Sequence, residues 1–222
     1  MGYAVAHVKG LYAILDLDFL HQHGVEPLPF ADAVLAARPA ALQVRAKSAG
    51  ARDALALLRA VQARAAAASV PLFANDRPDL ALLAGCAGVH LGQGDLSLAD
   101  ARRLDPRLAL GISTHGLEQL DDVLALPSAL RPAYVALGPI FHTSSKLNPE
   151  PVVGLATLAE AARRCRAAQV PLLAIGGLSL ARAPEVAPFA DLGAVISALL
   201  PDEGLPGVTR AVAALHAALG GR

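Results

Sequence analysis

The segment 138–146 carries side chains whose types and spacing suggest phosphate binding. Its sequence is Gly-Pro-Ile-Phe-His-Thr-Ser-Ser-Lys, and it follows the apolar run 133–137. It presents three hydroxyls and one cation, those of Thr143, Ser144, Ser145 and Lys146. Hydroxyls, backbone N–H groups and a lysine cation are the donors that a phosphate needs. A solvated turn would have a similar composition, so this segment alone leaves both interpretations open.

A second candidate anion site is the pattern Gln43-x-Arg45-x-Lys47, which ends another apolar run. Alternate residues of an extended segment point to one side, so this pattern places one amide and two cations together. A single exposed Arg or Lys is usually a solvated surface charge. Together, the three side chains suggest an anion site.

Carboxylates follow two further apolar runs. Asn75 and Asp76 follow the first run, and Asp95 lies in Gly-Gln-Gly-Asp after the second. Capping of a helix expected at 78–84 would explain Asn75 or Asp76 but less easily both, and Asp95 could cap a turn. As a pair, Asp76 and Asp95 would offer the oxygen ligands that Mg²⁺ prefers alongside substrate phosphates and waters.

Three more segments could contact a substrate. Ser113 could cap the following helix or hydrogen-bond a substrate ring, and His115 could act as an acid or base, although no partner for it is evident. The glycine pair Gly176-Gly177 would let a phosphate approach backbone N–H groups closely. Ile196 and Ser197 follow the last apolar run and lead into an expected short helical turn.

Such residues need a scaffold that brings many strand ends together. Eight short apolar runs are expected to be buried strands: Leu11–Leu15, Ala41–Val44, Pro71–Ala74, Gly88–Leu91, Ala109–Ile112, Ala133–Leu137, Pro171–Ile175 and Gly193–Ile196. Amphipathic helices are clearest at Ala51–Ala68, Leu155–Ala168 and Gly207–Leu219. This alternation predicts an α/β fold, a (β/α)₈ TIM barrel formed as a single domain by residues 1–222, with a doubly wound sheet as the alternative.

Barrel loops that follow strands build the active site, and every candidate residue above lies in such a loop or strand end. The longest irregular stretches are expected at Asp16–Leu28 and His142–Pro151. Both would lie on the same face of the barrel as the candidate residues.

The composition excludes several classes of protein. Hydrophobic residues make up 55% of the chain, yet no uncharged apolar run reaches the ~18 residues of a membrane span. The formal net charge is +0, so neither a nucleic-acid surface nor a membrane-binding patch is expected. Cys86 and Cys165 are expected to be small core residues rather than a disulfide. No secretory signal is evident, so a cytoplasmic protein acting on small molecules is expected, and the sequence leaves a homo-oligomer open.

In their order and spacing, these motifs closely resemble the thiamine phosphate synthase (thiamine-phosphate pyrophosphorylase) family, from about Leu11 to Leu200. The family pattern includes Gln-x-Arg-x-Lys, Asn-Asp-Arg, Gly-Val-His-x-Gly-Gln-x-Asp, Gly-x-Ser-x-His and Gly-Pro-Ile-Phe-x-Thr, and each is present here. Ala46 and Leu15 depart from the usual acidic residue and threonine, and Ser145 replaces the commoner threonine. None of these departures removes an expected ligand.

The resemblance implies a (β/α)₈ barrel that joins a hydroxymethylpyrimidine diphosphate to a hydroxyethylthiazole phosphate, releasing pyrophosphate. It assigns the diphosphate to Arg45, Lys47, Asn75 and Lys146, the cofactor Mg²⁺ to Asp76 and Asp95, and the pyrimidine to Gln43 and Ser113. It assigns the thiazole phosphate to the segment containing Thr143, Ser144 and Ser145, and to Gly177, Ile196 and Ser197. Arg45, Lys47, Ser113 and Lys146 are the residues expected to support catalysis.

Two other functions remain as alternatives. The related thiazole tautomerase shares the barrel and would use His115 for proton transfer. A non-catalytic sensor of thiazole or thiamine phosphate would need neither metal ligands nor diphosphate ligands. Gln43, Lys47, Asp76 and Asp95 favour the synthase.

Overall fold

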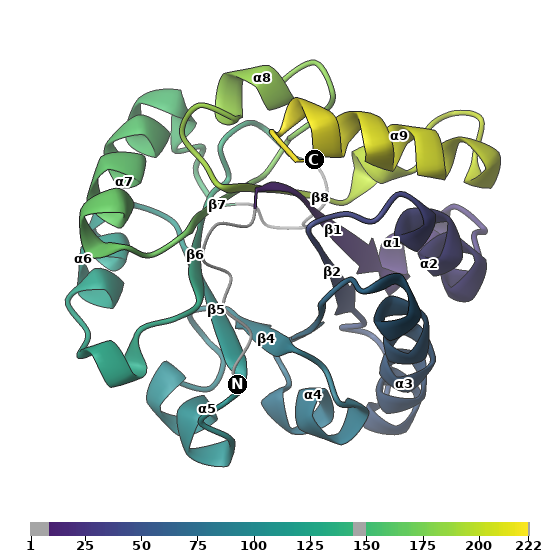
Figure 1. The fold of residues 1–222 in the computed structure, drawn as a ribbon, viewed down its shortest axis with the longest axis horizontal. Helices are drawn as coiled ribbons and strands as arrows, with labels where there is room; N and C mark the ends of the chain where they lie inside the picture. Colours follow the sequence, from purple (N-terminus) through teal and green to yellow (C-terminus); the bar gives the residue numbers. More distant parts are fainter. Residues whose placement is uncertain (1–8, 144–149, 222) are drawn as a thin grey trace.

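The computed structural model describes residues 9–143 and 150–221. Within these residues, eight parallel strands pair in chain order and close into a barrel, and helices surround it (Figure 1). The strands are β1 (Gly10–Asp16), β2 (Ala41–Arg45), β3 (Leu72–Asn75), β4 (Gly88–Leu91), β5 (Ala109–Thr114), β6 (Tyr134–Leu137), β7 (Leu172–Ile175) and β8 (Leu192–Val195). The α-helices are α1 (Leu17–Gln22), α2 (Pro27–Ala36), α3 (Ala51–Ala68), α4 (Pro78–Ala84), α5 (Leu98–Leu104), α6 (Leu117–Leu124), α7 (Gly154–Ala168), α8 (Ala183–Val186) and α9 (Leu205–Ala218). Short 3₁₀ turns are η1 (Ser128–Leu130) and η2 (Ser197–Leu199).

The ring closes because β1 pairs with both β2 and β8. Tyr12 lies in register with Ala41 on one side and with Ala194 on the other. Since all eight strands are parallel, their carboxyl ends meet at one rim of the barrel. The loops that carry the candidate residues therefore converge there.

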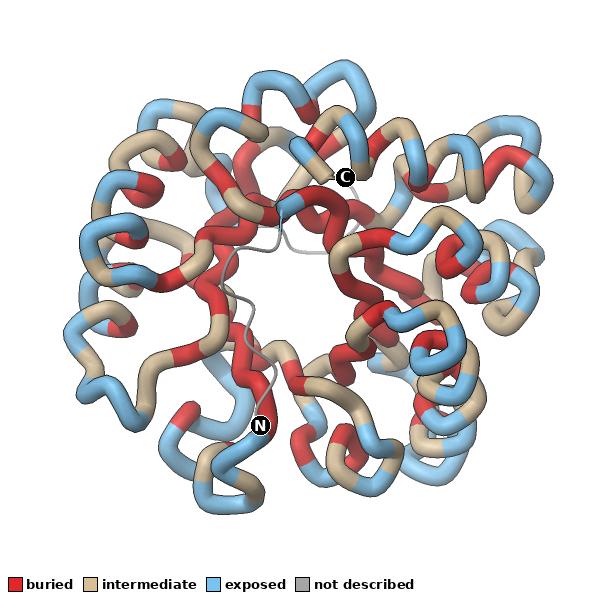
Figure 2. The backbone as a smooth tube through the Cα atoms, in the orientation of Figure 1, coloured by how far each residue is buried: buried red, intermediate tan, exposed pale blue. Residues whose placement is uncertain are grey.

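The strands are buried on both faces, which explains their continuous apolar runs. Along β1, Leu11, Ala13 and Leu15 pack in the layer between strands and helices. Tyr12 and Ile14 alternate with them and pack inside the barrel. Figure 2 shows the result, with a buried central ring and exposed outer faces on the helices.

Three aromatic rings fill the barrel interior. Tyr12 lies 5.6 Å from Tyr134 and 5.7 Å from Phe73 between ring centroids. Two glycines make room for these rings, because a Cβ atom on Gly88 would clash with Phe73 and one on Gly111 with Tyr134. The interior is a packed core below the rim.

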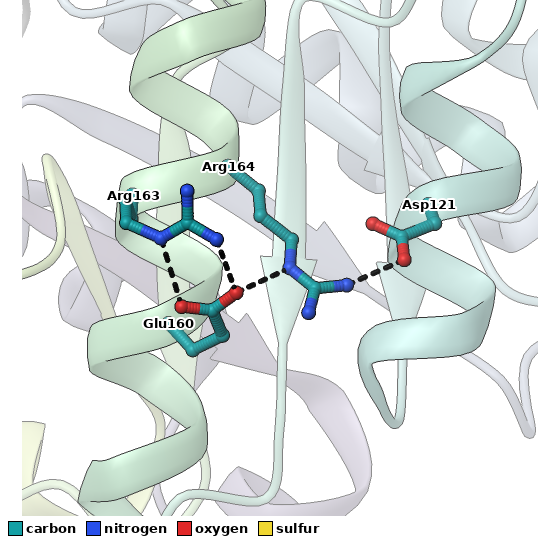
Figure 3. Close-up of polar contacts among 4 residues, drawn as sticks. All are labelled: Asp121, Glu160, Arg163 and Arg164. Carbon is teal, nitrogen blue, oxygen red and sulfur yellow. Dashed lines mark hydrogen bonds and ion pairs between the residues drawn. The ribbon is translucent and has the colours of Figure 1, made fainter.

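The outer helices pack against each other as well as against the strands. Helix α9 contacts α2 and β1, where the last unit of the barrel meets the first (Figure 1). Arg164 of α7 bridges Glu160 of the same helix, at 2.8 Å, and Asp121 of α6 (Figure 3). Hydrogen bonds from Arg163 and Arg164 lower the pKa of Glu160 to about 2. These ion pairs link α6 to α7 on the outside of the barrel.

The expected barrel is confirmed, and each expected strand differs from the observed one by at most two residues at either end. Cys86 and Cys165 are free thiols, as expected, and burial raises the pKa of each to about 12. Across the described residues, none of the helices combines the length and apolar character that a membrane span requires.

One expectation about the loops was wrong. The stretch Asp16–Leu28 is not irregular, since it contains α1 and the start of α2. Asp16 begins α1 because its Oδ1 accepts a hydrogen bond of 3.0 Å from the backbone N–H of Phe19. Pro27 begins α2 at a position where proline needs no backbone donor.

Candidate active site

Two adjoining cavities open at the rim where the strands end. The polar cavity is bordered mainly by β2, β3 and β4, and its polar lining residues are Tyr12, Gln43, Arg45, Lys47, Asn75, Asp76, His90, Asp95 and Ser113. The glycine cavity is bordered by β5 to β8 and includes Ser113, His115, Thr143, Glu150, Gly176, Gly177, Ile196 and Ser197. Both cavities share a wall made of Ser113, Ile175, Ala194 and Ile196. A ligand in one cavity would therefore lie directly beside a ligand in the other.

Two side chains in the last three residues of β2 are held by partners on neighbouring strands. Gln43 is buried and donates from Nε2 to Asn75 Oδ1 at 2.6 Å. Arg45 donates from Nη1 to Asp16 Oδ2 at 2.5 Å, and the Asp16 side chain is only 3% exposed. Asp16 thus uses one oxygen to cap α1 and the other to hold Arg45 at the cavity.

Asp76 pairs with the second cation. Its Oδ2 lies 3.0 Å from Lys47 Nζ, and its backbone adopts a positive φ of 63° as the chain leaves β3. Burial raises the pKa of Asp76 above its ordinary value, the neighbouring Asp95 raises it further, and Lys47 opposes this shift. The position of Asp76 beside a second carboxylate is the reason that a divalent cation would be stabilised here.

The capping role considered for Asn75 and Asp76 was wrong. Arg77 occupies the N-cap position of α4, and no side chain caps that helix. Asn75 and Asp76 instead point to Gln43 and Lys47 at the cavity. Both residues thus belong to the site rather than to the end of a helix.

Asp95 has a structural partner in addition to its place in the cavity. Its Oδ2 accepts a hydrogen bond of 2.6 Å from the backbone N–H of Gly92, so the turn interpretation was correct. The same carboxylate lines the polar cavity with Asp76. Within residues 9–143 and 150–221, no group of three or more His, Cys, Asp or Glu side chains could hold a metal. A pair of carboxylates suits Mg²⁺, which commonly keeps waters and substrate phosphates as its other ligands.

Ser113 occupies the shared wall and is tied to two neighbours. Its Oγ lies 2.8 Å from His90 Nε2, and its backbone carbonyl accepts a 2.6 Å hydrogen bond from Gln93 Nε2. The other ring nitrogen of His90 is also hydrogen-bonded, since its Nδ1 lies 2.9 Å from the hydroxyl of Tyr134. Helix capping by Ser113 was wrong, since Gly116 is the N-cap of α6 and makes no side-chain bond.

The glycine cavity owes its shape to the turn after β7. Gly176 and Gly177 have φ values of +102° and +65°, and a Cβ on Gly177 would clash with the backbone of His142. The backbone N–H of Phe141 donates to Gly176 at 3.0 Å, which joins the loop after β6 to this turn. The N–H groups of Gly177 and Ser197 donate to no other described residue. These two donors are available to an anion in the cavity.

His115 also borders the glycine cavity. Its Nδ1 lies 2.8 Å from the carbonyl oxygen of Gly138, and its backbone N–H donates to Gln119 Oε1 at 2.8 Å. Thr143 lines the same cavity, whereas Ser144, Ser145 and Lys146 lie outside the described residues. Their roles stay predictions.

A model of the thiamine monophosphate synthase family matches residues 11–199. The chain belongs to this family. A thiamine-phosphate synthase of Koribacter versatilis (strain Ellin345) is 42% identical over 199 residues, covering 86% of this chain and 89% of that protein. One from Anaeromyxobacter dehalogenans (strain 2CP-C) is 41% identical over 196 residues, covering 88% of this chain and 80% of that protein. Among solved structures, thiamine phosphate pyrophosphorylase from Pyrococcus furiosus has a TM-score of 0.81 at 26% identity, over 98% of both chains.

These similarities confirm the thiamine monophosphate synthase family and the barrel that the motifs predicted. The chain is accordingly an enzyme of the transferase class. The alternatives of a tautomerase and a sensor receive no support from these relatives.

The structure adds site residues that the sequence patterns did not indicate. Asp16 was expected only as the first residue of an irregular stretch, yet it ends β1 and holds Arg45. Tyr12 and Tyr134 resemble ordinary core residues in the sequence, yet their hydroxyls face each other at 2.8 Å. The sequence did contain one indication of this contact, namely two tyrosines at strand positions that point into the barrel. A buried hydroxyl needs a hydrogen-bond partner, so each tyrosine could have been expected to find one there.

Proposed function

We propose that this chain joins 4-amino-5-hydroxymethyl-2-methylpyrimidine diphosphate to hydroxyethylthiazole phosphate, giving thiamine phosphate and pyrophosphate. The observation that carries this proposal is the pair of cavities that share one wall. One cavity offers cations and carboxylates, and the other offers backbone donors. Two substrates that each carry phosphate could thus meet at Ser113.

The diphosphate would lie in the polar cavity. Arg45 and Lys47 supply positive charge, and Asn75 supplies an amide beside them. Arg45 is already anchored by Asp16, so little side-chain freedom would be lost when it binds an anion. Gln43 and Ser113 would contact the pyrimidine ring, and Lys146 would add a further cation to the diphosphate.

Asp76 and Asp95 would hold Mg²⁺ at the diphosphate. Their carboxylates line one cavity, and the pKa of Asp76 is raised by burial and by Asp95, as expected for two acids brought close together. Bound Mg²⁺ would supply charge neutralisation for the leaving pyrophosphate. Lys47 would then serve both the carboxylate and the diphosphate.

The thiazole phosphate would lie in the glycine cavity. The N–H groups of Gly177 and Ser197 and the hydroxyl of Thr143 border that space, with Ser144 and Ser145 as further predicted donors. Loops after the seventh and eighth strands form a recurrent phosphate site in barrels of this kind. The thiazole ring would then face the pyrimidine across Ser113 and Ile196.

The reaction needs no nucleophile from the protein. The bond between the pyrimidine methylene carbon and the diphosphate oxygen breaks, and its electrons leave with pyrophosphate. The electron-rich aminopyrimidine stabilises the resulting methylene cation, and the thiazole nitrogen supplies the electron pair of the new C–N bond. The protein contributes position and a preorganised electrostatic environment, chiefly through Arg45, Lys47 and Lys146.

The decisive experiment is turnover of the two substrates by the purified protein, with Mg²⁺ or with EDTA. We expect thiamine phosphate and pyrophosphate in equal amounts with Mg²⁺ and neither with EDTA. Product that forms equally well in EDTA would contradict the metal assignment. A folded protein that binds thiazole phosphate but makes no product would direct attention to His115 and the tautomerase reaction.

We also propose that residues 1–222 form one domain that works in the cytoplasm on small molecules alone. The formal net charge of +0 supports the absence of a nucleic-acid or membrane partner. The oligomeric state would follow from light scattering.

A further inference from the structure

A chain of hydrogen bonds runs from the core of the barrel to the shared wall of the two cavities. Tyr12 Oη lies 2.8 Å from Tyr134 Oη, and Tyr134 Oη lies 2.9 Å from His90 Nδ1. On the other side of the ring, His90 Nε2 lies 2.8 Å from Ser113 Oγ. These residues come from β1, β6, β4 and β5, so the chain crosses the barrel interior.

Burial restricts the direction of these hydrogen bonds. Tyr12 is 1% exposed and Tyr134 is fully buried, and desolvation raises the pKa of both phenols, so both carry a proton. Within the described residues, the Tyr12 hydroxyl has no hydrogen-bond partner other than Tyr134. A buried hydroxyl proton without an acceptor is costly, so Tyr12 must donate and Tyr134 must accept.

The direction then follows along the chain. Tyr134 has one proton, and its remaining neighbour is His90 Nδ1, so Tyr134 donates to that nitrogen. An imidazole that accepts at Nδ1 carries its proton on Nε2, and His90 therefore donates to Ser113 Oγ. The hydroxyl proton of Ser113 is left to point into the cavities.

The opposite direction of the hydrogen bonds would leave one buried proton without an acceptor. If Ser113 donated to His90, then Nδ1 would donate to Tyr134 and Tyr134 to Tyr12. The proton of Tyr12, whose side chain is 1% exposed at the inner end of the polar cavity, would then have no acceptor among the described residues. A doubly protonated His90 leads to the same unpaired proton.

We propose that Tyr12 and Tyr134 are positioning residues that act through His90 to present Ser113 as a hydrogen-bond donor to the pyrimidine substrate. The inference rests on the proposed function, in which Ser113 faces a pyrimidine ring. A ring nitrogen of an aminopyrimidine is an acceptor, so a fixed donor selects it and orients the methylene carbon toward the second cavity. Tyr134 lines neither cavity, and Tyr12 is only 1% exposed where it borders the polar cavity, so their effect passes through the Ser113 hydroxyl.

The first test observes the proton on His90 directly and does not require turnover. Correlation NMR spectra of protein with ¹⁵N-labelled histidine distinguish the two neutral tautomers, and the His90→Gln variant assigns the resonance among the seven histidines. We expect the tautomer protonated on Nε2. A ring protonated on Nδ1, or on both nitrogens, would overturn the proposal even if the enzyme makes thiamine phosphate.

The second test is a double-mutant cycle between Tyr134→Phe and Ser113→Ala. Loss of one buried hydrogen bond predicts that Tyr134→Phe lowers kcat/KM for the pyrimidine diphosphate about tenfold and leaves KM for the thiazole phosphate within about twofold. Tyr12→Phe should have a smaller effect of about threefold, because Tyr134 can still donate to His90. In the Ser113→Ala background, Tyr134→Phe should cause no further loss.

A matched control separates positioning from packing. Phe73 contacts both tyrosine rings, and Phe73→Leu disturbs the same cluster without removing a hydroxyl. Its effect on kcat/KM should be equal in the wild-type protein and in the Ser113→Ala variant. If Tyr134→Phe also causes equal losses in both backgrounds, or no loss at all, the proposal is wrong. If the wild-type protein makes no thiamine phosphate, the proposed function fails, and the tautomer of His90 still decides the direction of the chain.

Discussion

The ion pair between Asp16 and Arg45 allows stability and substrate binding to be tested at one position. Asp16→Asn keeps an oxygen that can cap α1 but removes the negative charge that holds Arg45. A hydrogen bond to a charged group contributes about 1 kcal/mol more than a neutral one. We therefore expect the free energy of unfolding to fall by about 1–2 kcal/mol, which lowers Tm by roughly 2–8 °C in a chain of this size.

Asp16→Ala should destabilise the protein further, since it also removes the cap of α1. Loss of a capping side chain typically costs about 1 kcal/mol, so the total is expected at about 2–4 kcal/mol. The exposed pair between Arg64 and Asp32 provides the control, because both side chains are at least 36% exposed. Asp32→Asn should change the free energy of unfolding by less than about 0.5 kcal/mol.

Asp16→Asn should also weaken binding of the pyrimidine diphosphate. An Arg45 side chain that is no longer anchored must be ordered on binding, at a cost of about 0.5–1.5 kcal/mol, so KM should rise roughly twofold to twelvefold. Thermal unfolding and steady-state kinetics of Asp16→Asn measure both effects. Wild-type Tm together with wild-type KM would refute the reasoning, because it would mean that Asp16 neither stabilises nor positions Arg45.

Three further predictions concern other parts of the structure. Gly177→Ala should raise KM for the thiazole phosphate and lower Tm, because φ of residue 177 is +65° and the new Cβ would clash with the backbone of His142. KM for the pyrimidine diphosphate, measured in parallel, is the control. Asp76→Asn should reduce kcat by more than about tenfold and raise the Mg²⁺ concentration needed for half-maximal rate. The Tm of this variant in EDTA should stay close to that of the wild type. An unchanged dependence of the rate on Mg²⁺ would contradict the assignment of Asp76 as a ligand. Arg164→Met removes the bridge to Asp121 and should leave kcat/KM unchanged. Any decrease in Tm should become smaller in high salt, because salt screens an exposed ion pair. A change in kcat/KM would show that the outer surface of α6 and α7 influences the rim.

The strands could be predicted because the barrel buries them on both faces. Residues 72–75 and 134–137 form short apolar runs for this reason, and glycine or proline marks the ends of most runs. Helix α1 escaped prediction because it has only six residues, too few to show an apolar period. Its signs were local, namely Asp16 at the cap and Asp18 in the first turn.

The candidate site could be predicted where strand ends share a rim. Gln43, Arg45, Asn75 and Asp95 lie in one cavity because each lies at the end of its strand or follows it by a few residues at most. The partners of these residues depend on register, which the sequence does not express. Asn75 faces Gln43 only because β2 and β3 align at their carboxyl ends.

The chain of hydrogen bonds from Tyr12 to Ser113 could not be predicted either, because it also depends on how the strands are paired. Alternation along β1 and β6 indicates that Tyr12 and Tyr134 share the barrel interior. That they touch depends on the closure of eight strands and on the small residues, such as Gly111, that admit the rings. Neither condition is visible in a local stretch of sequence.

The shared wall between the two cavities has a consequence for product inhibition. Thiamine phosphate carries the pyrimidine and the thiazole phosphate in one molecule, so it would occupy both cavities at once. Either substrate must displace it before a new cycle begins. We therefore expect thiamine phosphate to compete with both substrates, whereas inorganic phosphate in the glycine cavity alone would compete only with the thiazole phosphate.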